Sequence, residues 1–126
     1  MLEVGIIKTI EEYVTKEKTA KVFGSGALSV YATPAMITLM EKTSAMLVEP
    51  FLAEGEGTVG ISVNIKHISA TPVGKTITCN SELVEIDKKR LVFKVEAYDE
   101  KGKIGEGTHE RFIINNDRFM EKVNTK

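Results

Sequence analysis

The sequence has few of the features that mark secreted, membrane-spanning or nucleic-acid-binding proteins. It contains one cysteine, Cys79, which cannot form an internal disulfide and therefore favours an intracellular setting. The net charge of −1 provides no basic surplus for nucleic acid or an anionic membrane. No apolar run is long enough to span a bilayer, and no charged-then-apolar leader opens the chain. We expect a soluble cytoplasmic protein with no nucleic-acid or membrane partner.

Several common active-site motifs are also missing. Cysteine and histidine do not occur at metal-ligand spacing. The chain has neither a phosphate loop of the G-x-x-x-x-G-K type nor a G-x-S-x-G nucleophile elbow. We therefore expect no metal site, and we look for chemistry in residues that are distant along the chain.

Proline is scarce, and two of the three prolines bracket the one plain helical segment, Thr33 to Pro50. Thr33 suits the N-cap, and Pro34 suits the first helical position because its missing N–H would be unpaired there. An apolar stripe at helical spacing lies between the ends and comprises Met36, Leu39, Met40, Thr43, Met46 and Leu47. The stripe predicts a helix packed on a sheet, with Glu41 lying off the stripe.

The rest of the chain is predicted to form mainly strands. Residues 1–19 mix β-branched residues with Glu and Lys, and the β-branched residues favour a first strand. Four further strands with alternating apolar residues are predicted over residues 58–67, 76–86, 91–98 and 104–114. Residues 24–32, GSGALSVYA, predict a loop, and residues 115–126 predict a polar tail with one helical turn around Phe119 and Met120.

One helix and five antiparallel strands joined by short turns define an α+β fold. The length of 126 residues suits a single domain, assigned to residues 1–126, and 42% hydrophobic residues suffice for one core. One helix covers only part of a five-stranded sheet. The edge strands and the exposed flank of the helix therefore predict association with a second copy.

Two titratable side chains are candidates for acid–base chemistry. His67 ends a strand face that is otherwise composed of Val59, Ile61, Val63 and Ile65. An imidazole there either bonds to a backbone carbonyl or acts as an acid–base group. Glu41, in the middle of the helix, is either a solvated carboxylate or the partner of that imidazole. A mid-helix carboxylate and a strand-end imidazole together suit general acid–base catalysis.

Thr33 has a structural role as the predicted helix cap, and its separation from Glu41 limits direct contact. Eight residues of helix rise about 12 Å. The two could share a small substrate through His67, or if a second subunit supplied one of them. Gly60 is expected to face away from His67, and a glycine inside a strand marks a bulge or a close approach at which its N–H could meet a ligand.

The last predicted strand contains further polar residues in GEGTHERF. We assign His109 to a polar outer face of the sheet. Arg111 either shares that face or lies in a cleft, where its guanidinium would bind an anion. The tip Lys88–Arg90 is basic, and it is either solvated or a site for a phosphate-bearing cofactor.

Three blocks of sequence carry a resemblance to a known family: VYATPAMITLMEKT (30–43), VGISVNIKHISATPVGKTIT (59–78) and EGTHERFII (106–114). In this order they resemble the fluoroacetyl-CoA thioesterase-like family of hotdog-fold proteins. The resemblance implies a hotdog fold, in which a five-stranded antiparallel sheet wraps one long central helix. It also implies a homodimer, or a dimer of dimers, with active sites at the subunit interface.

The same resemblance implies a set of site residues. By position, the catalytic threonine, glutamate and histidine of the family look like Thr33, Glu41 and His67. The glycine that lines the acyl site falls on Gly60, and the arginine of the last strand falls on Arg111. The implied activity is hydrolysis of a small or short acyl-CoA thioester, with coenzyme A as part of the substrate and no separate cofactor.

One departure concerns the acyl group. In the fluoroacetyl-specific member, the segment before the threonine is longer and carries phenylalanines that form a lid. Here that segment is GSGALSVYA, in which Tyr31 is the only aromatic residue. This argues against fluoroacetyl-CoA as the substrate but leaves the thioester chemistry in place. The alternatives to a thioesterase are a non-hydrolytic acyl-CoA binder and a dehydratase or hydratase acting on an acyl thioester.

Overall fold

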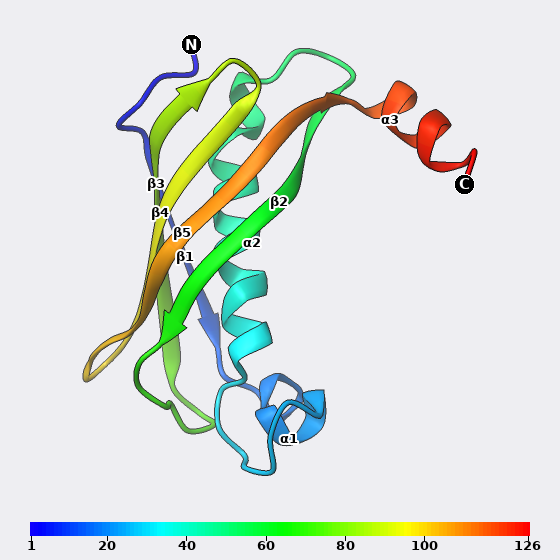
Figure 1. Ribbon diagram of the computed structural model, residues 1–126. Coiled ribbons are helices and arrows are strands. Elements are labelled where there is room, and N and C mark those ends of the chain that lie inside the picture. Colours follow the sequence, from blue (N-terminus) through cyan, green and yellow to red (C-terminus); the bar gives the residue numbers. More distant parts are fainter.

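The computed structural model describes residues 1–126, in which one long helix lies against a five-stranded sheet (Figure 1). This helix, α2 (Thr33–Val48), begins at the Thr-Pro pair, where the fixed φ of Pro34 suits the first turn. Its N-cap is Ala32, so the expectation that Thr33 caps the helix is wrong. The regular helix ends two residues before Pro50, as the missing N–H of proline requires.

The buried face of α2 matches most of the predicted apolar stripe. It comprises Ala35, Met36, Leu39, Met40, Thr43, Ser44, Leu47 and Val48. Met46 was expected in the stripe but is 38% exposed, because it lies at the edge of the helical face. Ser44 donates to the carbonyl of Met40 (2.8 Å) and accepts from the hydroxyl of Ser81 in the sheet (2.8 Å), which ties helix to sheet.

The sheet is antiparallel throughout, with the strand order β1-β3-β4-β5-β2. The strands are β1 (Ile7–Tyr13), β2 (Glu56–His67), β3 (Thr76–Asp87), β4 (Arg90–Asp99) and β5 (Gly102–Asn115). All five predicted strands are present, and the first is shorter than the segment in which it was expected. β2 follows the helix in the chain but pairs with the last strand, so β1 and β2 form the two edges.

Four short helices complete the chain: η1 (Lys16–Lys18), α1 (Ala20–Phe23), η2 (Glu49–Phe51) and α3 (Asn116–Val123). α1 was not predicted; the Thr19 hydroxyl caps it by accepting from Val22 N–H, and Gly24 ends it with a φ of 75°. α3 is longer than the single turn expected there, and it projects from the end of β5 (Figure 1). No helix combines the length and hydrophobicity that crossing a bilayer requires.

The core lies between α2 and the inner face of β3 and β4. The strands contribute alternate residues to it: Ile77, Cys79, Leu83, Leu91, Phe93, Val95 and Ala97. This is the alternation expected of strands with one buried face. Both strands are central in the sheet, which explains why their predicted faces agree with the structure.

β2 departs from simple alternation because it contains a β-bulge. Its pairing with β5 shifts register between Gly60 and Ser62. One extra residue moves all later side chains to the other face of the sheet. Gly60 lies opposite the buried Arg111, so it faces the helix, and His67 beyond the bulge also lies beside the start of the helix. The expectation that Gly60 faces away from His67 is therefore wrong.

The edge position of β2 also leaves apolar side chains in contact with solvent. Ile61 is 50% exposed and Val63 is 40% exposed, although both were expected on a face bordering the core. Ile61 is the residue at the bulge, where the ladder is interrupted. One long edge of the sheet thus presents both unpaired backbone groups and apolar side chains.

Candidate active site

The start of α2 and the end of β2 meet through the side chains of Thr33 and His67. Thr33 Oγ1 lies 2.8 Å from His67 Nδ1. The two residues are 34 positions apart in the chain. Because Ala32 is the N-cap, the Thr33 hydroxyl is not engaged in capping and can bond to the imidazole. The fold therefore brings together two of the three residues for which a catalytic role is predicted.

The surroundings of His67 keep its imidazole neutral near pH 7. Burial lowers its pKa below the usual value of 6.5, and a hydrogen bond with the backbone of Ser69 only partly opposes this. The Nε2 atom is buried and has no hydrogen-bond partner. The imidazole thus has a hydroxyl partner at Nδ1 and an uncommitted nitrogen at Nε2, a combination that suits proton exchange.

Tyr31 fixes one side of this imidazole. Its ring meets the His67 ring edge-on, with centroids 6.3 Å apart. Its hydroxyl donates to Glu12 Oε2 in β1 at 2.5 Å, and the ring is 1% exposed. Burial, together with the Glu12 carboxylate, raises the pKa of Tyr31 far above its usual value. Tyr31 is thus a neutral hydrogen-bond donor that packs against the His67 ring and is tied to β1 through Glu12. Its position in a predicted loop did not reveal these contacts.

A pocket of about 300 Å³ adjoins the Thr33–His67 pair. Besides these two residues, its lining comprises Ala20, Ser25, Val30, Tyr31, Ile68, Ser69 and Ala70. The lining side chains are mostly small, and several come from the segment between α1 and α2 that was predicted as a loop. The pair therefore faces a space that can hold a small group.

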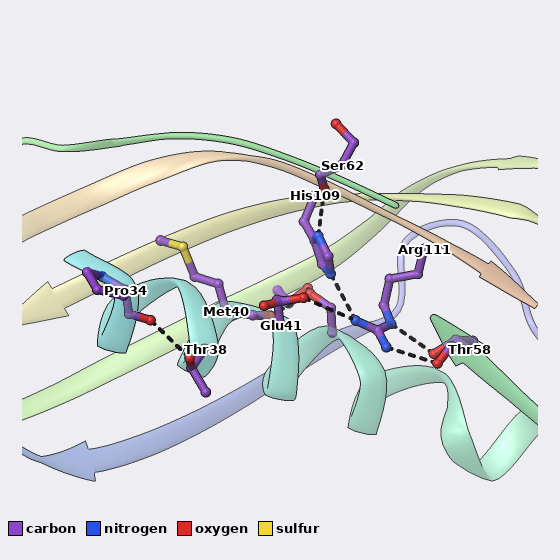
Figure 2. A network of polar contacts seen from close by, with 10 residues as sticks. Pro34, Thr38, Met40, Glu41, Thr58, Ser62, His109 and Arg111 are labelled. Atoms are coloured by element: carbon purple, nitrogen blue, oxygen red, sulfur yellow. Dashed lines mark hydrogen bonds and ion pairs between the residues drawn. The ribbon is translucent and has the colours of Figure 1, made fainter. Parts of the chain in front are cut away.

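Glu41 lies away from the Thr33–His67 pair, eight residues further along α2. Its Oε2 atom lies 3.9 Å from Arg111 Nη1 in β5 (Figure 2). The Glu41 side chain is 41% exposed, whereas that of Arg111 is 10% exposed. A half-exposed carboxylate beside a buried guanidinium is placed to meet a molecule that approaches from solvent.

Arg111 is held firmly by β2. Its Nε donates to Thr58 Oγ1 at 2.8 Å, and its Nη2 donates to the Thr58 carbonyl at 3.1 Å. Burial lowers the pKa of Arg111, and the Glu41 carboxylate opposes that change. The guanidinium remains charged, since its usual pKa is far above neutrality. Arg111 is therefore buried and does not lie on a polar outer face.

His109 lies beside Arg111 and is not on an outer face, so that expectation is wrong. It is 1% exposed, because its side chain, like that of Arg111, lies on the face of β5 that is turned toward the helix. Its Nδ1 is 2.8 Å from the Ser62 carbonyl oxygen, and its Nε2 is 3.1 Å from Arg111 Nη1. The alternation with Arg111 was visible in the sequence, but which face was buried was not.

Gly60 lies beside Glu41, His109 and Arg111. A Cβ atom at this position would lie 2.8 Å from Glu41 Oε2, 3.3 Å from His109 Cε1 and 3.4 Å from Arg111 Nη1. Any side chain would therefore displace the carboxylate from its present place. The absence of a side chain at Gly60 is what lets Glu41 approach the sheet.

Within one chain, the predicted site residues thus form two groups. Thr33 and His67 lie at the pocket, and Glu41, Gly60 and Arg111 lie further along the helix. Eight residues of helix between Thr33 and Glu41 correspond to about 12 Å. No residue of the second group lines the pocket beside the first.

Two further features considered in the sequence are metal-binding residues and the basic hairpin tip. No cluster of three or more His, Cys, Asp or Glu side chains could hold a metal ion. At the basic hairpin tip, Arg90 forms ion pairs with Glu85 (3.1 Å) and Glu110 (3.3 Å). The Arg90 guanidinium is thereby engaged within the sheet, which leaves the two lysines as the solvated part of that tip.

Comparison with known proteins points to one family. Residues 14–117 match the model of a family described as fluoroacetyl-CoA-specific thioesterase. The fluoroacetyl-CoA thioesterase of Streptantibioticus cattleyicolor is 40% identical over 97 residues, which are 77% of this chain and 70% of that protein.

Solved structures of similar shape agree. A structure of the fluoroacetyl-CoA thioesterase FlK superposes with a TM-score of 0.94 at 34% identity, covering 100% of this chain and 98% of that one. A mutant of FlK in complex with fluoroacetate and CoA gives a TM-score of 0.89 at 35% identity, covering 94% and 99%. A thioesterase superfamily member from Thermus thermophilus gives a TM-score of 0.92 at 28% identity, covering 99% and 93%. The wrapped helix and sheet of this chain are the predicted hotdog fold.

Proposed function

Because this chain belongs to the fluoroacetyl-CoA-specific thioesterase family, we propose that it hydrolyses an acyl-CoA thioester with a small acyl group. The observation that carries the proposal is the Thr33–His67 pair at the wall of a pocket of about 300 Å³. A hydroxyl bonded to a neutral imidazole at the edge of a small space suits acyl-transfer chemistry. Coenzyme A enters as part of the substrate, and the proposed chemistry uses no separate cofactor.

Hydrolysis of a thioester needs a nucleophile, a donor for the oxyanion and a proton for the leaving sulfur. In our proposal, Glu41 either takes a proton from the attacking water, or attacks the carbonyl carbon itself to form an anhydride that water then hydrolyses to the free acid and the regenerated carboxylate. In both routes the C–S bond breaks, and His67 acts as the acid–base partner through which the leaving thiolate receives its proton. Thr33 positions the substrate or the nucleophile against the imidazole. All three are roles that a hydroxyl, a carboxylate and an imidazole can fill without a metal.

The oxyanion requires hydrogen-bond donors. Backbone N–H groups at the start of α2 are candidates, because the first turn of a helix has N–H groups without intrahelical partners and carries the positive end of the helix dipole. We propose that Gly60 and Arg111 bind the substrate next to Glu41. Gly60 leaves room for close approach of a ligand, and Arg111 provides a fixed positive charge.

We propose that the working unit is a homodimer in which one protomer supplies Thr33 and His67 and the other supplies Glu41. The two groups do not meet within one chain, as shown above. β2 is an open edge with exposed Ile61 and Val63, so it offers a surface for a second copy. A cytoplasmic location also remains a prediction, and it rests on the single buried thiol of Cys79.

The acyl group is proposed to be small and distinct from fluoroacetyl. The pocket beside His67 is lined mostly by small side chains, and its loop wall contains no phenylalanine between Gly24 and Ala32. A panel of acyl-CoA substrates of increasing chain length, assayed by release of free thiol, tests this. We expect the shortest straight-chain acyl groups to give the largest kcat/KM, with fluoroacetyl-CoA not preferred over acetyl-CoA.

The catalytic assignments have a direct test in Glu41→Gln and His67→Gln. Each variant is expected to lower kcat by roughly 10²-fold or more, because each removes an acid–base group. The exposed Lys94→Ala, on the outer face of the central strand β4, is the matched control and should retain wild-type kcat. Wild-type rates in both site variants would contradict the assignment. Tight acyl-CoA binding by the wild-type protein without thiol release would instead identify a binder.

A further inference from the structure

We propose that His109 is a positioning residue, whose ring holds the Arg111 guanidinium and, through it, the carboxylate of Glu41. This inference rests on the proposed function, because it takes Glu41 as the group that Arg111 serves. Nothing in the sequence distinguished His109 from a residue on a solvated face. Its place in the structure is between a backbone carbonyl and a buried cation, which Figure 2 shows.

The hydrogen-bond partners of His109 allow only one state of the ring. The Ser62 carbonyl can only accept, so Nδ1 must carry the hydrogen and donate to it at 2.8 Å. The Arg111 guanidinium can only donate, so Nε2 must be the unprotonated acceptor at 3.1 Å. His109 is therefore a neutral imidazole with both nitrogens engaged, and its lone pair is aimed at Arg111 Nη1.

Packing prevents the ring from leaving this position. The imidazole is 1% exposed and stacks on Phe93 of β4, with centroids 6.0 Å apart and an interplanar angle of 28°. Its hydrogen-bond partners come from β2 and β5, so three strands fix one ring. A side chain held this way can in turn hold a neighbour.

Arg111 depends on His109 for one of its three anchored nitrogens. Thr58 holds Nε and Nη2, but Nη1 has only His109 at hydrogen-bond distance and Glu41 at 3.9 Å. Without the acceptor at His109, Nη1 would lose its nearest partner, and the guanidinium would be free to shift away from its present position. Glu41 would then lose the fixed positive charge beside which it lies.

The charges around His109 agree with a neutral ring. Arg111 on β5 disfavours its protonation, whereas the Ser62 carbonyl on β2, Glu41 on α2 and Glu110 on β5 favour it. The side chain of β4 that stacks on the ring is the uncharged Phe93. Burial is the largest influence and lowers the pKa of His109 below its usual value. A protonated ring would direct an N–H at the guanidinium and break the contact.

Two substitutions separate the acceptor from the packing. His109→Gln places a carbonyl oxygen near the position of Nε2 and can still accept from Arg111. His109→Leu fills similar volume against Phe93 but has no acceptor. We expect His109→Leu to lower kcat by roughly 10- to 100-fold, the change that follows loss of a hydrogen bond to a charged group. KM should change by less than about threefold, and His109→Gln should stay within about threefold of wild type in both constants.

A second readout does not depend on turnover. In 15N NMR of the whole protein, we expect the side-chain N–H signals of Arg111 to be resolved and slow to exchange in wild type and in His109→Gln. They should be broadened or lost in His109→Leu. Lys94→Ala serves as the surface control for both measurements, since Lys94 is exposed and lies on the face of β4 opposite to that of the buried Phe93.

The outcomes distinguish this inference from the proposed function. Unchanged kcat and unchanged Arg111 signals in His109→Leu would overturn the positioning role, and so would equal losses in the Gln and Leu variants. A change confined to KM would also contradict it. If wild type releases no thiol from any acyl-CoA but the Arg111 signals respond as expected, the positioning role stands and the proposed function fails.

Should His109→Leu not fold, His109→Asn takes its place with the same expectations, since it retains a donor near Ser62.

Discussion

At the scale of single residues, the two histidines of this chain show how neighbours decide the role of a side chain. Both are neutral near pH 7 because burial lowers their pKa values. His109 has a partner on each nitrogen, whereas Nε2 of His67 is buried with none. The satisfied imidazole of His109 agrees with the proposed positioning role, and the unsatisfied one of His67 agrees with the proposed acid–base role. Neighbouring groups in one sheet therefore leave the two rings in different hydrogen-bonding states.

The lowered histidine pKa values predict how stability depends on pH. The unfolded chain binds protons on both histidines below about pH 6.5, where the folded protein still resists them. The histidine contribution to the free energy of unfolding is thus fully present above that pH. It decreases as the pH falls through 6.5 toward the folded pKa values.

Urea denaturation between about pH 7.5 and pH 5 measures this dependence. His109→Gln should show a shallower decline than wild type, because one of the two groups no longer titrates. A free energy of unfolding that rises on acidification over this range would contradict the burial argument for both rings.

At the scale of elements, the contact between α2 and the sheet includes a buried polar link as well as apolar packing. The Ser44 hydroxyl donates to the helix backbone at Met40 and accepts from Ser81 in β3. Both serines are fully buried. Such a pair fixes how far along β3 the helix lies, since apolar contacts alone permit sliding. The placement of Thr33 and Glu41 on the helix depends on that register.

We expect Ser44→Ala to lower the free energy of unfolding by about 1–3 kcal/mol, because it leaves the buried hydroxyl of Ser81 without an acceptor. The double variant Ser44→Ala/Ser81→Ala should recover part of the loss, since no unpaired hydroxyl remains. Thr38→Ala removes a similar hydroxyl-to-carbonyl bond on the exposed side of α2 and should change stability by less than about 0.5 kcal/mol. Simple additivity of the two serine substitutions in urea denaturation would show that they are not coupled.

At the scale of the whole molecule, the separation of the site into two groups is the main consequence of the fold. Thr33 and His67 meet at the helix start, and Glu41 lies about 12 Å of helix further on. A single protomer therefore holds the predicted site residues in two separate groups beside α2, and in our proposal each group is one half of a site. The proposed homodimer would join a half-site of one protomer to the complementary half-site of its partner.

Mixing two inactive variants tests this arrangement. If each site takes Glu41 from one protomer and His67 from the other, a heterodimer of Glu41→Gln and His67→Gln contains one intact site. After the two variants are unfolded together in equal amounts and refolded, about one quarter of wild-type activity should return, because half of the dimers are mixed and each has one of two sites intact. Each variant refolded alone is the control. No recovery after demonstrated mixing would place both residues of each site in the same protomer.

The sequence by itself determined the family, the order of elements and the α+β fold with its single long helix. Those follow from periodicity, from prolines that bound a helix, and from three blocks of residues that resemble the thioesterase family; the comparisons confirm the family, the hotdog fold and the thioester hydrolase class. Local patterns suffice there because helices and central strands bury one regular face. The roles assigned to Thr33, Glu41 and His67 stay predictions.

Only the tertiary structure decided which side chains face one another across the sheet. The bulge beside Gly60 reverses the faces of β2, and no periodic pattern in one strand reveals where its ladder to β5 is interrupted. The burial of His109 likewise depends on which face of β5 the helix covers. The contact of the Thr33 hydroxyl with His67 depends on Ala32, and not Thr33, being the N-cap of the helix. Register and cap geometry arise from pairing between distant segments, so they are set by the folded molecule and not by any local stretch of sequence.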